Sequence, residues 1–600
     1  MSYPYGIIGN CISAALVSDD ASIDWLCMPH YDSPSICAKL LDAEKGGSFK
    51  ITGVNTTQIT QEYVRHTAIL KTRVETAEGV FDIYDFMPRY IMSDHEYYCP
   101  SEVQRNILVI SGKPRIKVHI DLRPNNATTG AKIIEENEYL KYVNESGDYH
   151  SFYLYTNIDF KKITGHEEIT LSGTSYLVLS YHQKVLPFNA DRNYLEFERT
   201  KSYWLGWVAN PNMPEAHREW IIRSLITLKL LMYQRTGAVI AAPTTSLPEI
   251  VGQERNWDYR YCWIRDASMI IELFSRLGHF HSSSRYMGFI LNQMLSKQDN
   301  IAVMYSIHGE KVLEEKALAH LSGYRNSRPV RVGNNAYKQI QNDLYGELID
   351  AIFTYFTINH RKGFHFDQEL WTVVRTLVNR SAKVWEKPDN GIWEYRGQPQ
   401  HFVFSKLMNW VAMDRAAKIA RFIGKTKYAQ ECFERAYAIR EDILTKGWNA
   451  EKEAFTMYYG SSAADAAVLL MLHYGFLEPD DPRMIKTIEF CHRELLKDGH
   501  VMRYTHDDDF GKPQNAFVLC TFWMAKALYL VGRKEEARTL FRSALAAANP
   551  LGLFSEGYNP REKCQVGNFP QGYSHMAFIQ TALLLETDSR WGTYQWDGPY

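Results

Sequence analysis

The sequence predicts an antiparallel β-sandwich followed by a double-layered barrel of helices, within a chain of 600 residues. Three observations lead to this fold class. In the first third of the chain, apolar and polar residues alternate around glycine-containing turns, which is typical of strands with one face in water. After Pro214 the apolar residues recur at helical spacing. The connections between the expected helices alternate between short and long, as they do in a series of antiparallel hairpins.

The strand pattern is clearest in three segments of the first region, which are 72–90, 106–124 and 138–156. The earlier segment 9–41 is more typical of short strands and loops. We expect the sandwich domain to cover residues 1–201, a linker to cover 202–213, and the helical domain to cover 214–600.

Twelve helices are expected in the second region. They are predicted near 215–236, 263–277, 280–296, 338–358, 367–385, 401–423, 427–446, 462–474, 483–497, 515–531, 534–548 and 573–587. The connections after the first, third, fifth, seventh, ninth and eleventh helices are long, and the others are shorter. Six hairpins closed into a barrel would place all the long loops at one end, where binding sites usually form.

The composition argues against several classes of function. A net charge of −2 gives no electrostatic support for binding nucleic acid or an anionic membrane. No run of about 18 apolar residues is present, and the first residues lack a signal-peptide pattern. The nine cysteines are scattered and form no CxxC pair, so we expect a reducing, cytoplasmic location. Phosphate-loop, zinc-protease, dinucleotide-binding and nucleophile-elbow motifs are absent, so no metal or organic cofactor is expected.

Two glutamates on separate long loops are the strongest candidates for chemistry. Glu394 follows Trp393 in PDNGIWEYR, and an apolar neighbour raises the pKa of a carboxyl group so that it can donate a proton. Alternatively, Glu394 is a loop residue that pairs with Arg396.

Glu556 lies in LGLFSEGYNP, where Ser555 and Tyr558 are able to hydrogen-bond an ionised carboxylate that activates water. The alternative is a surface glutamate beside a helix. A proton donor and a base separated by about 6.5–9.5 Å are what inverting cleavage of a sugar–sugar bond requires. The 14 Trp and 38 Tyr residues also suit sugar binding, although most aromatic side chains fill cores.

Other polar and aromatic residues cluster on the same loops. Arg265 and Asp266 are adjacent in WIRDAS, where one side chain donates and the other accepts hydrogen bonds to vicinal sugar hydroxyls. The alternative role of Asp266 is to stabilise a helix start. Trp263 and Tyr261 stack on a sugar ring or pack in the core.

A further loop contains Tyr324, Arg325, Arg328 and Arg331, which either line a polar pocket or bond to loop carbonyls.

Four motifs together resemble glycoside hydrolase family 15, which contains glucoamylases, glucodextranases and a branch of trehalases. The motifs are residues 7–35, 244–268, 388–406 and 567–578. The resemblance extends over nearly the whole chain. It implies a β-sandwich followed by an (α/α)6 barrel, and an inverting, exo-acting hydrolase of α-glucosides.

The resemblance also implies residue roles. Glu394 matches the general acid and Glu556 the general base. Arg265 and Asp266 match the pair that binds the hydroxyls of the terminal glucose.

Trp263, Tyr261 and Trp393 match positions around the innermost subsite. The sequence departs from the pattern at Tyr395 and Gly557, where family members carry acidic or amide residues. These two changes leave the preferred leaving group open.

We therefore expect hydrolysis of terminal α-glucosyl bonds in malto-oligosaccharides or related α-glucans, with release of β-glucose. A trehalase that cleaves α,α-trehalose is the first alternative, and a disaccharide phosphorylase, which replaces the base with phosphate, is the second. A carbohydrate-binding protein without catalysis is the third. The only expected partner is the carbohydrate substrate.

Overall fold

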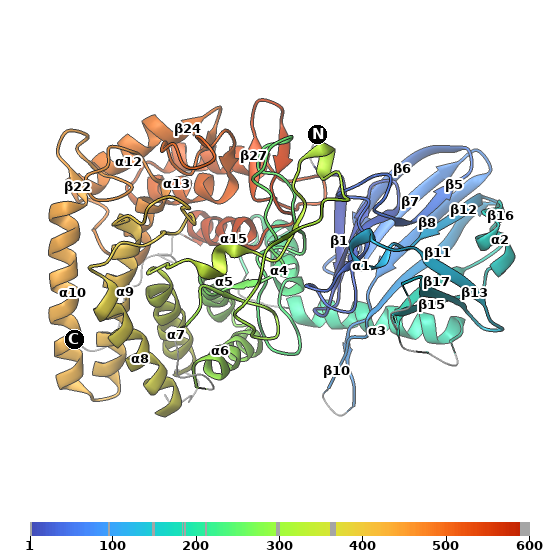
Figure 1. Cartoon of the computed structure of the whole chain (residues 1–600), viewed down its shortest axis with the longest axis horizontal. Coiled ribbons are helices and arrows are strands. Elements are labelled where there is room, and N and C mark those ends of the chain that lie inside the picture. The colour runs from blue at the N-terminus through green and yellow to red at the C-terminus, as the bar shows by residue number, and fades with distance from the viewer. Residues whose placement is uncertain are drawn as a thin grey trace.

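The computed structural model describes residues 3–93, 96–146, 150–182, 184, 188–209, 213–295, 301–360 and 368–587. Figure 1 shows a smaller lobe of β-sheets beside a larger lobe of helices. The predicted order of an antiparallel β-domain followed by a helical barrel is confirmed.

Two antiparallel sheets build the smaller lobe of the described chain. The first has the order β1 (Tyr5–Gly9), β2 (Ala14–Ser18), β3 (Ser22–Cys27), β5 (Ser48–Gly53), β12 (Arg115–Asp121) and β16 (Ile169–Thr170), with β4 (Ser35–Cys37) paired to β3. The second has the order β13 (Ala131–Glu135), β14 (Leu140–Asn144), β15 (Ser151–Thr156), β17 (Ser175–Tyr181), β11 (Glu102–Gly112), β8 (Gly79–Phe86), β7 (Leu70–Thr76) and β6 (Thr56–Tyr63). One buried apolar cluster draws residues from both sheets, as in a sandwich.

A buried ion pair links the two sheets of the sandwich. Arg105 on β11 lies opposite Asp85 on β8, and both side chains are fully buried with Nε 2.7 Å from Oδ1. The same guanidinium group donates to the carbonyl of Phe49 on β5 at 2.6 Å and to that of Ala21, in the turn between β2 and β3 of the first sheet, at 2.8 Å. Each nitrogen of the Arg105 guanidinium group thus has a hydrogen-bond partner, as buried polar groups generally do.

A helix occupies the place where the sequence predicts a linker. Helix α3 (Ala190–Val208) begins at Asn189, whose side chain accepts a hydrogen bond from the amide of Arg192. Near its start, Asn193 bonds to Gln104 of β11, and near its end Trp204 joins the core of the barrel. The predicted linker at 202–213 therefore begins inside a helix that contacts both lobes. The helical pattern is hidden in the sequence because the face packed on the sheet carries polar residues.

Two concentric layers of helices build the larger lobe. The outer helices are α4 (Arg218–Leu230), α6 (Phe280–Leu295), α8 (Gln368–Val384), α10 (Thr426–Lys446), α12 (Pro482–Leu495) and α14 (Lys534–Leu545). The inner helices are α5 (Ile264–Arg276), α7 (Leu344–His360), α9 (Val403–Phe422), α11 (Met471–Tyr474), α13 (Val518–Leu530) and α15 (Gly572–Thr587). Along the ring, α5 contacts α7, α7 contacts α9, α11 contacts α13, α13 contacts α15 and α15 contacts α5. The 3-10 helix η3 (Ala466–Leu470) contacts both α9 and α11 and so closes the ring. The inner helices begin where the long loops end.

All twelve predicted helices have a counterpart, but the eighth is shorter than expected. Residues 466–470 form a 3-10 helix, η3 (Ala466–Leu470), and α11 follows it directly. Asp465 caps η3 by accepting a hydrogen bond from the amide of Ala467 at 2.9 Å. The residues before this cap form part of a long loop, so the helix cannot begin at 462.

The remaining described elements are short. They are α1 (Pro124–Ala127), α2 (Phe160–Thr164), η1 (Tyr324–Asn326), η2 (Asn335–Lys338), β9 (Tyr90–Ile91), β10 (Tyr97–Tyr98), β18 (Cys262–Trp263), β19 (Met304–Tyr305), β20 (Lys316–Ala317), β21 (Arg331–Val332), β22 (Trp448–Asn449), β23 (Ala454–Phe455), β24 (Leu496–Lys497), β25 (His500–Val501), β26 (Ala516–Phe517), β27 (Gly557–Asn559) and β28 (Cys564–Val566).

The two lobes share one apolar core. Trp25 and Tyr31 of the β-domain belong to the same buried cluster as the inner helices. The indole of Trp25 donates to the carbonyl of Pro243 at 2.7 Å. Tyr3 donates through its amide to Gln565 and through its hydroxyl to the carbonyl of Gly567, both at 3.1 Å. The β-domain thus supports two of the loops at the mouth of the barrel.

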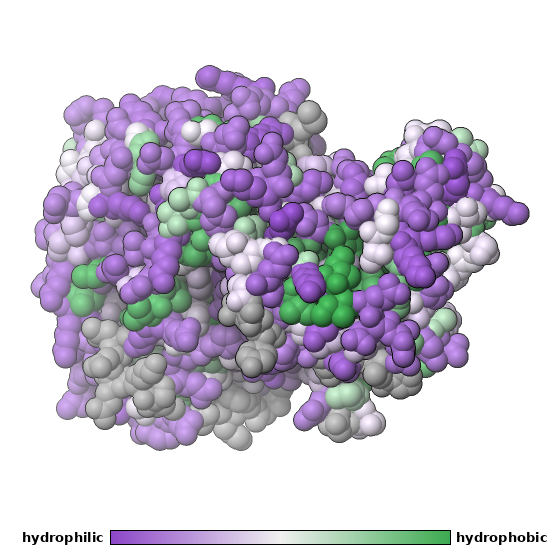
Figure 2. Space-filling model, turned by 45° about the vertical axis from the view of Figure 1, so that its right-hand side comes forward, coloured by the Kyte–Doolittle hydropathy of each residue, from purple (hydrophilic) through white to green (hydrophobic). Residues whose placement is uncertain are grey.

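The outer surface in Figure 2 is mostly hydrophilic, with an apolar patch near the junction of the lobes. Among the helices of the described residues, none combines the length and the apolar character that a membrane-spanning segment needs. All nine cysteines lie within the described residues, and each of them is a free thiol.

Replacing Arg105 with glutamine is expected to destabilise the sandwich by about 3–5 kcal/mol, because Asp85 is left buried without its partner. The control is Arg115→Gln, since Arg115 is 35% exposed in its pairs with Glu78 and Glu168. That change should cost much less, because solvent screens an exposed ion pair. Urea denaturation of the two variants measures the difference, and equal midpoints would contradict the role of Arg105.

Candidate active site

A pocket opens at the end of the barrel where the long loops meet. It contains about 800 Å³ of empty space, part of which is open to solvent. Its walls come from the loops before α5, between α8 and α9, between α12 and α13, and before α15. Glu394 and Glu556 both line this pocket. The two glutamates selected from the sequence therefore face one shared space, although 162 positions separate them in the chain.

Glu394 lies in a turn between α8 and α9 that neighbouring side chains hold in place. The side chain of Asn390 donates to the carbonyl of Tyr395 at 2.8 Å. Glu394 itself has a φ of 57°, a left-handed conformation that few residues other than glycine adopt. The indole of Trp263 donates to Oε1 of Glu394 at 2.5 Å, and Arg265 Nη2 lies 3.7 Å from the same oxygen. Arg396, the alternative partner, lies near Glu315 instead, with Nη2 3.8 Å from Oε2.

Glu556 precedes β27 and is almost completely buried, with 2% of the residue exposed. The hydroxyl of Tyr259 donates to its Oε1 at 2.5 Å. The sequence analysis expected Ser555 and Tyr558 as donors, but the Ser555 hydroxyl bonds to the carbonyl of Gly557. Tyr558 packs against the ring of His500. Successive side chains of this segment point in different directions, so a residue distant in sequence supplies the donor.

The electrostatic environment of Glu556 also differs from the expectation. Burial raises its pKa to about 8, and the nearby carboxylate of Glu249 acts in the same direction. The hydrogen bond from Tyr259 and the positive charge of Arg503 oppose this shift. The local sequence indicates hydrogen-bond donors near Glu556 but not its burial. Burial adds a free-energy cost to ionising the carboxyl group.

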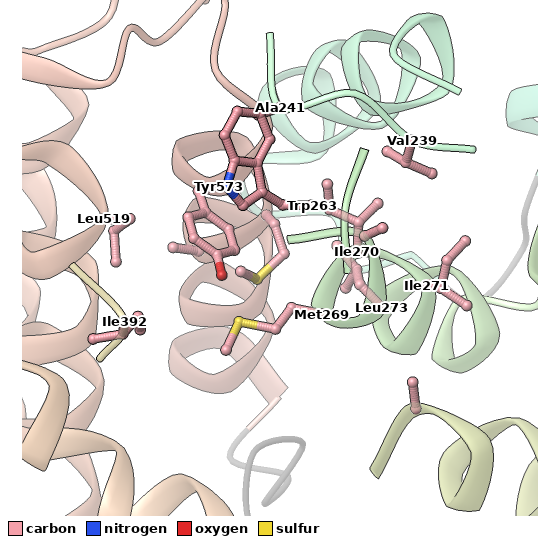
Figure 3. Packing of buried hydrophobic residues seen from close by; sticks show 14 of the residues in the cluster. Val239, Ala241, Trp263, Met269, Ile270, Ile271, Leu273, Ile392, Leu519 and Tyr573 are labelled. Carbon is pink, nitrogen blue, oxygen red and sulfur yellow. The ribbon is translucent and has the colours of Figure 1, made fainter. Parts of the chain in front are cut away.

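Two aromatic side chains connect the glutamates. The rings of Tyr259 and Trp263 meet edge to face with centroids 5.4 Å apart. Tyr259 bonds to Glu556 and Trp263 bonds to Glu394, so the two carboxylates are fixed to one aromatic pair. Figure 3 shows Trp263 in a buried cluster with Met269, Ile270 and Leu273 of α5 and with Tyr573 of α15. This packing restricts where either carboxylate can move.

Arg265 lies among three carboxylates at the start of α5. Its guanidinium nitrogens are 3.3 Å from Asp266, 3.7 Å from Glu394 and 3.9 Å from Asp343. Tyr573 accepts from Nε at 2.9 Å. Burial raises the pKa of Asp266 to about 6, while Arg265 opposes the shift. Oδ2 of Asp266 is the oxygen that pairs with Arg265, and Asp266 lines the pocket beside Tyr573.

The other residues selected from the sequence lie in different places. Trp393 lines the pocket, and its indole donates to Asp465 at 2.8 Å. Tyr261 is buried in the core and is not part of the pocket wall. Arg325 is exposed outside the pocket, over the ring of Tyr324. Arg331 also lies outside it, so its contacts decide which of the two roles it has.

Arg331 bonds to the carbonyls of Glu254 and Asn256, at 2.9 and 2.8 Å. It also lies over the face of Trp257, with its guanidinium carbon 4.5 Å from the ring centroid. Arg331 thus bonds to loop carbonyls, as the alternative role allowed.

Several pocket residues were not selected from the sequence. Tyr573 lies in the quoted motif 567–578, so the motif contained a signal for it. Glu249, Arg255 and Arg503 also line the pocket. Arg503 is distant from the other two in the sequence, so no sequence motif indicates that they lie together. Among the described residues, no group of three or more His, Cys, Asp or Glu side chains is arranged to hold a metal ion.

The pocket therefore offers a pair of carboxyl groups in unlike environments. Glu394 is 24% exposed and contacts an indole donor and a guanidinium group. Glu556 is buried and contacts a phenol hydroxyl. Two acidic groups that differ in this way are able to act as proton donor and proton acceptor on opposite sides of one substrate bond.

The sequence model for glycosyl hydrolases family 15 matches residues 215–583, which cover the barrel. The chain belongs to this family. A second model, described as trehalase-like N-terminal, matches residues 5–155 within the sandwich. The resemblance found from the four motifs is therefore confirmed, and the protein is a family 15 glycoside hydrolase.

Several other proteins match over nearly the full length. A trehalase of Thermoplasma volcanium is 34% identical over 592 residues, covering 97% of this chain and 93% of the relative. A trehalase of Mycolicibacterium smegmatis is 33% identical and covers 96% of this chain and 90% of its own length. The fold is similar to that of a bacterial glucoamylase solved with acarbose, with a TM-score of 0.70 and 13% identity, over 98% of this chain and 94% of that one.

Gly567 provides a test of how closely Glu556 is held. A Cβ added at Gly567, where φ is 75°, would lie 2.3 Å from Glu556 Oε2. Gly567→Ala should therefore displace the carboxylate and lower kcat/KM about 100-fold, since shifts of about 1 Å have effects of this size. Gly460→Ala is the matched control, because Gly460 has a φ of 79° and no atom within 4 Å of the added Cβ. Equal activity of the two variants would show that the close approach is unimportant.

Proposed function

We propose that the protein is a trehalase that hydrolyses α,α-trehalose to glucose with inversion at the attacked carbon. The observation that carries the proposal is that Glu394 and Glu556 line one pocket. The choice of trehalose is supported by full-length relatives named trehalases at 34% and 33% identity. The sequence analysis favoured malto-oligosaccharides, and these relatives favour its first alternative instead.

In the proposed reaction Glu394 is the general acid. It protonates the oxygen between the two glucose units as the bond to the anomeric carbon breaks. The indole of Trp263 and Nε2 of Gln341, which lies 3.5 Å from Oε1, orient the carboxyl group. The role is supported by the partial exposure of Glu394 toward the pocket, where a glycosidic oxygen has access to it.

Glu556 is the general base of the proposed reaction. It removes a proton from a water molecule that attacks the anomeric carbon from the opposite face. The hydrogen bond from Tyr259 fixes one oxygen and leaves the other free to accept the proton. An inverting reaction predicts that the two carboxyl groups stand about 6.5–9.5 Å apart, so that water fits between them and the sugar.

The polar lining of the pocket supports a disaccharide substrate. Arg265, Asp266 and Tyr573 offer donors and an acceptor for the hydroxyls of the glucose that is attacked. Farther along the wall, Arg396 and Asp509 offer charged groups to the second glucose. Both glucose units of trehalose keep every hydroxyl except the anomeric one, and charged groups bond strongly to these hydroxyls.

The substrate is tested by comparing trehalose, maltose, maltotriose and isomaltose at equal concentrations in phosphate-free buffer. We expect kcat/KM for trehalose to exceed that for maltose by at least about 100-fold, because hydrogen bonds to the second glucose discriminate strongly. Proton NMR at early times should show equal amounts of α- and β-glucose from trehalose, because only the attacked unit inverts. Faster cleavage of maltose would return the assignment to a glucoamylase, and a requirement for phosphate would indicate a phosphorylase.

The two catalytic roles are tested by Glu394→Gln and Glu556→Gln. Each variant should lose at least about 1,000-fold in kcat while retaining the wild-type circular dichroism spectrum, because glutamine keeps the shape but cannot transfer the proton. Glu562→Gln is the control, since Glu562 lies on the same loop as Glu556 but is exposed. Near-normal turnover by either of the first two variants would refute the corresponding role.

A further inference from the structure

A second pocket lies behind Glu556. It contains about 320 Å³ of empty space. Glu249, Arg255, Arg503, Phe517 and Glu556 line both this pocket and the active-site pocket. The general base of the proposed reaction therefore borders two spaces, and the larger one is the proposed substrate pocket.

Glu249 is held between two arginines next to this second pocket. Nη2 of Arg503 donates to its Oε2 at 2.9 Å, and Nη1 of Arg255 lies 3.7 Å from the same oxygen. The backbone of Glu249 is fixed by the side-chain amide of Asn515, which donates to its carbonyl at 2.7 Å. The side chain of Glu249 is 17% exposed, whereas Glu556 is nearly inaccessible. Glu249 thus has the contact with solvent that Glu556 lacks.

Inverting hydrolysis leaves one proton on the base in every turnover. The O–H bond of the attacking water breaks, its oxygen bonds to the anomeric carbon, and the proton goes to Glu556. The acid has meanwhile given its proton to the leaving sugar and must recover one from solvent. The product occupies the front of Glu556 at this moment, so the base needs another way to lose its proton.

We propose that Glu249 is the proton-relay residue that takes this proton from Glu556 through the second pocket and passes it to bulk solvent. The inference rests on the proposed function, because it requires Glu556 to be the base. It assigns a role to Glu249 in the known class of reaction, and Arg503 positions that carboxylate beside the pocket.

The charges around the pair agree with a shared proton. Burial, followed by the charge of Glu249, raises the pKa of Glu556, so one proton on the two carboxylates is favoured over none. The titratable and charged groups that face the pair are Arg503, Arg255, Asp508, Tyr259, Tyr504, Tyr3 and Glu394. Of these, Arg503 and Arg255 form ion pairs with Glu249, with Arg503 Nη2 2.9 Å and Arg255 Nη1 3.7 Å from its Oε2.

The test compares wild type with Glu249→Gln on whichever α-glucoside the wild-type enzyme cleaves fastest, from about pH 5 to about pH 10. Without the charge at position 249, ionisation of Glu556 costs less, so the acidic limb of kcat/KM should move about one pH unit toward lower pH. At pH values above the acidic limb, kcat of Glu249→Gln should be about tenfold lower than that of wild type. Its solvent deuterium isotope effect should be larger, because proton release becomes slow.

Two further variants separate a proton relay from a structural role. Glu249→Asp keeps a carboxylate and should restore most of the wild-type pH profile. Glu254→Gln removes an exposed charge from the same loop and should match wild type throughout. The inference is overturned if Glu249→Gln lowers kcat and kcat/KM equally at every pH with no shift of the limb. It is also overturned if Glu249→Asp gives no recovery.

Failure of the proposed function would look different. Cleavage of maltose instead of trehalose changes the substrate but leaves the comparison of pH profiles valid. Normal turnover by Glu556→Gln would contradict the role of Glu556 as the base, and the proposed relay through Glu249 would fail with it. If Glu556→Gln is inactive and the pH profile of Glu249→Gln is not shifted from that of wild type, only the proposed relay is contradicted.

Discussion

The hydrogen bond from Tyr259 to Glu556 is the contact around which the active site is arranged. A carboxylate buried to this degree is costly to ionise, and the proposed role of Glu556 as a base requires its ionised form. The phenol hydroxyl and the nearby Arg503 offset part of that cost. The same tyrosine packs against Trp263, which bonds to Glu394. The position of one carboxyl group is thereby coupled to the position of the other.

This coupling depends on the closed ring of inner helices. Each long loop enters an inner helix at its N-terminal end, so side chains from loops far apart in sequence converge at one mouth. Arg265 illustrates the result, because it contacts Asp266 on its own helix, Asp343 before α7 and Glu394 before α9. Arg265 can contact all three carboxylates only when α5 and the loops before α7 and α9 are correctly placed relative to one another.

The sequence was sufficient to predict the architecture, and it selected two glutamates that line one pocket. The helical periodicity of segments such as α9 and α13 is strong, and the alternation of loop lengths indicates hairpins. Helix α3 was missed because Asn193 and Glu196, which are polar, lie on its buried face. The partner of Glu556 was also missed, since Tyr259 lies 297 positions away and only the closed barrel brings the two together. Burial is likewise a property of the fold, so the raised pKa of Glu556 is not visible in the local sequence.

Tyr3, in the β-domain, bonds to Gln565 and Gly567 on the loop that carries Glu556. The sandwich is therefore part of the foundation of the catalytic apparatus and not an independent module attached beside it. A barrel joined to an unrelated domain would keep both glutamates but would lose the two hydrogen bonds from Tyr3. Replacing the sandwich would therefore also disturb the segment that holds Glu556 in the pocket.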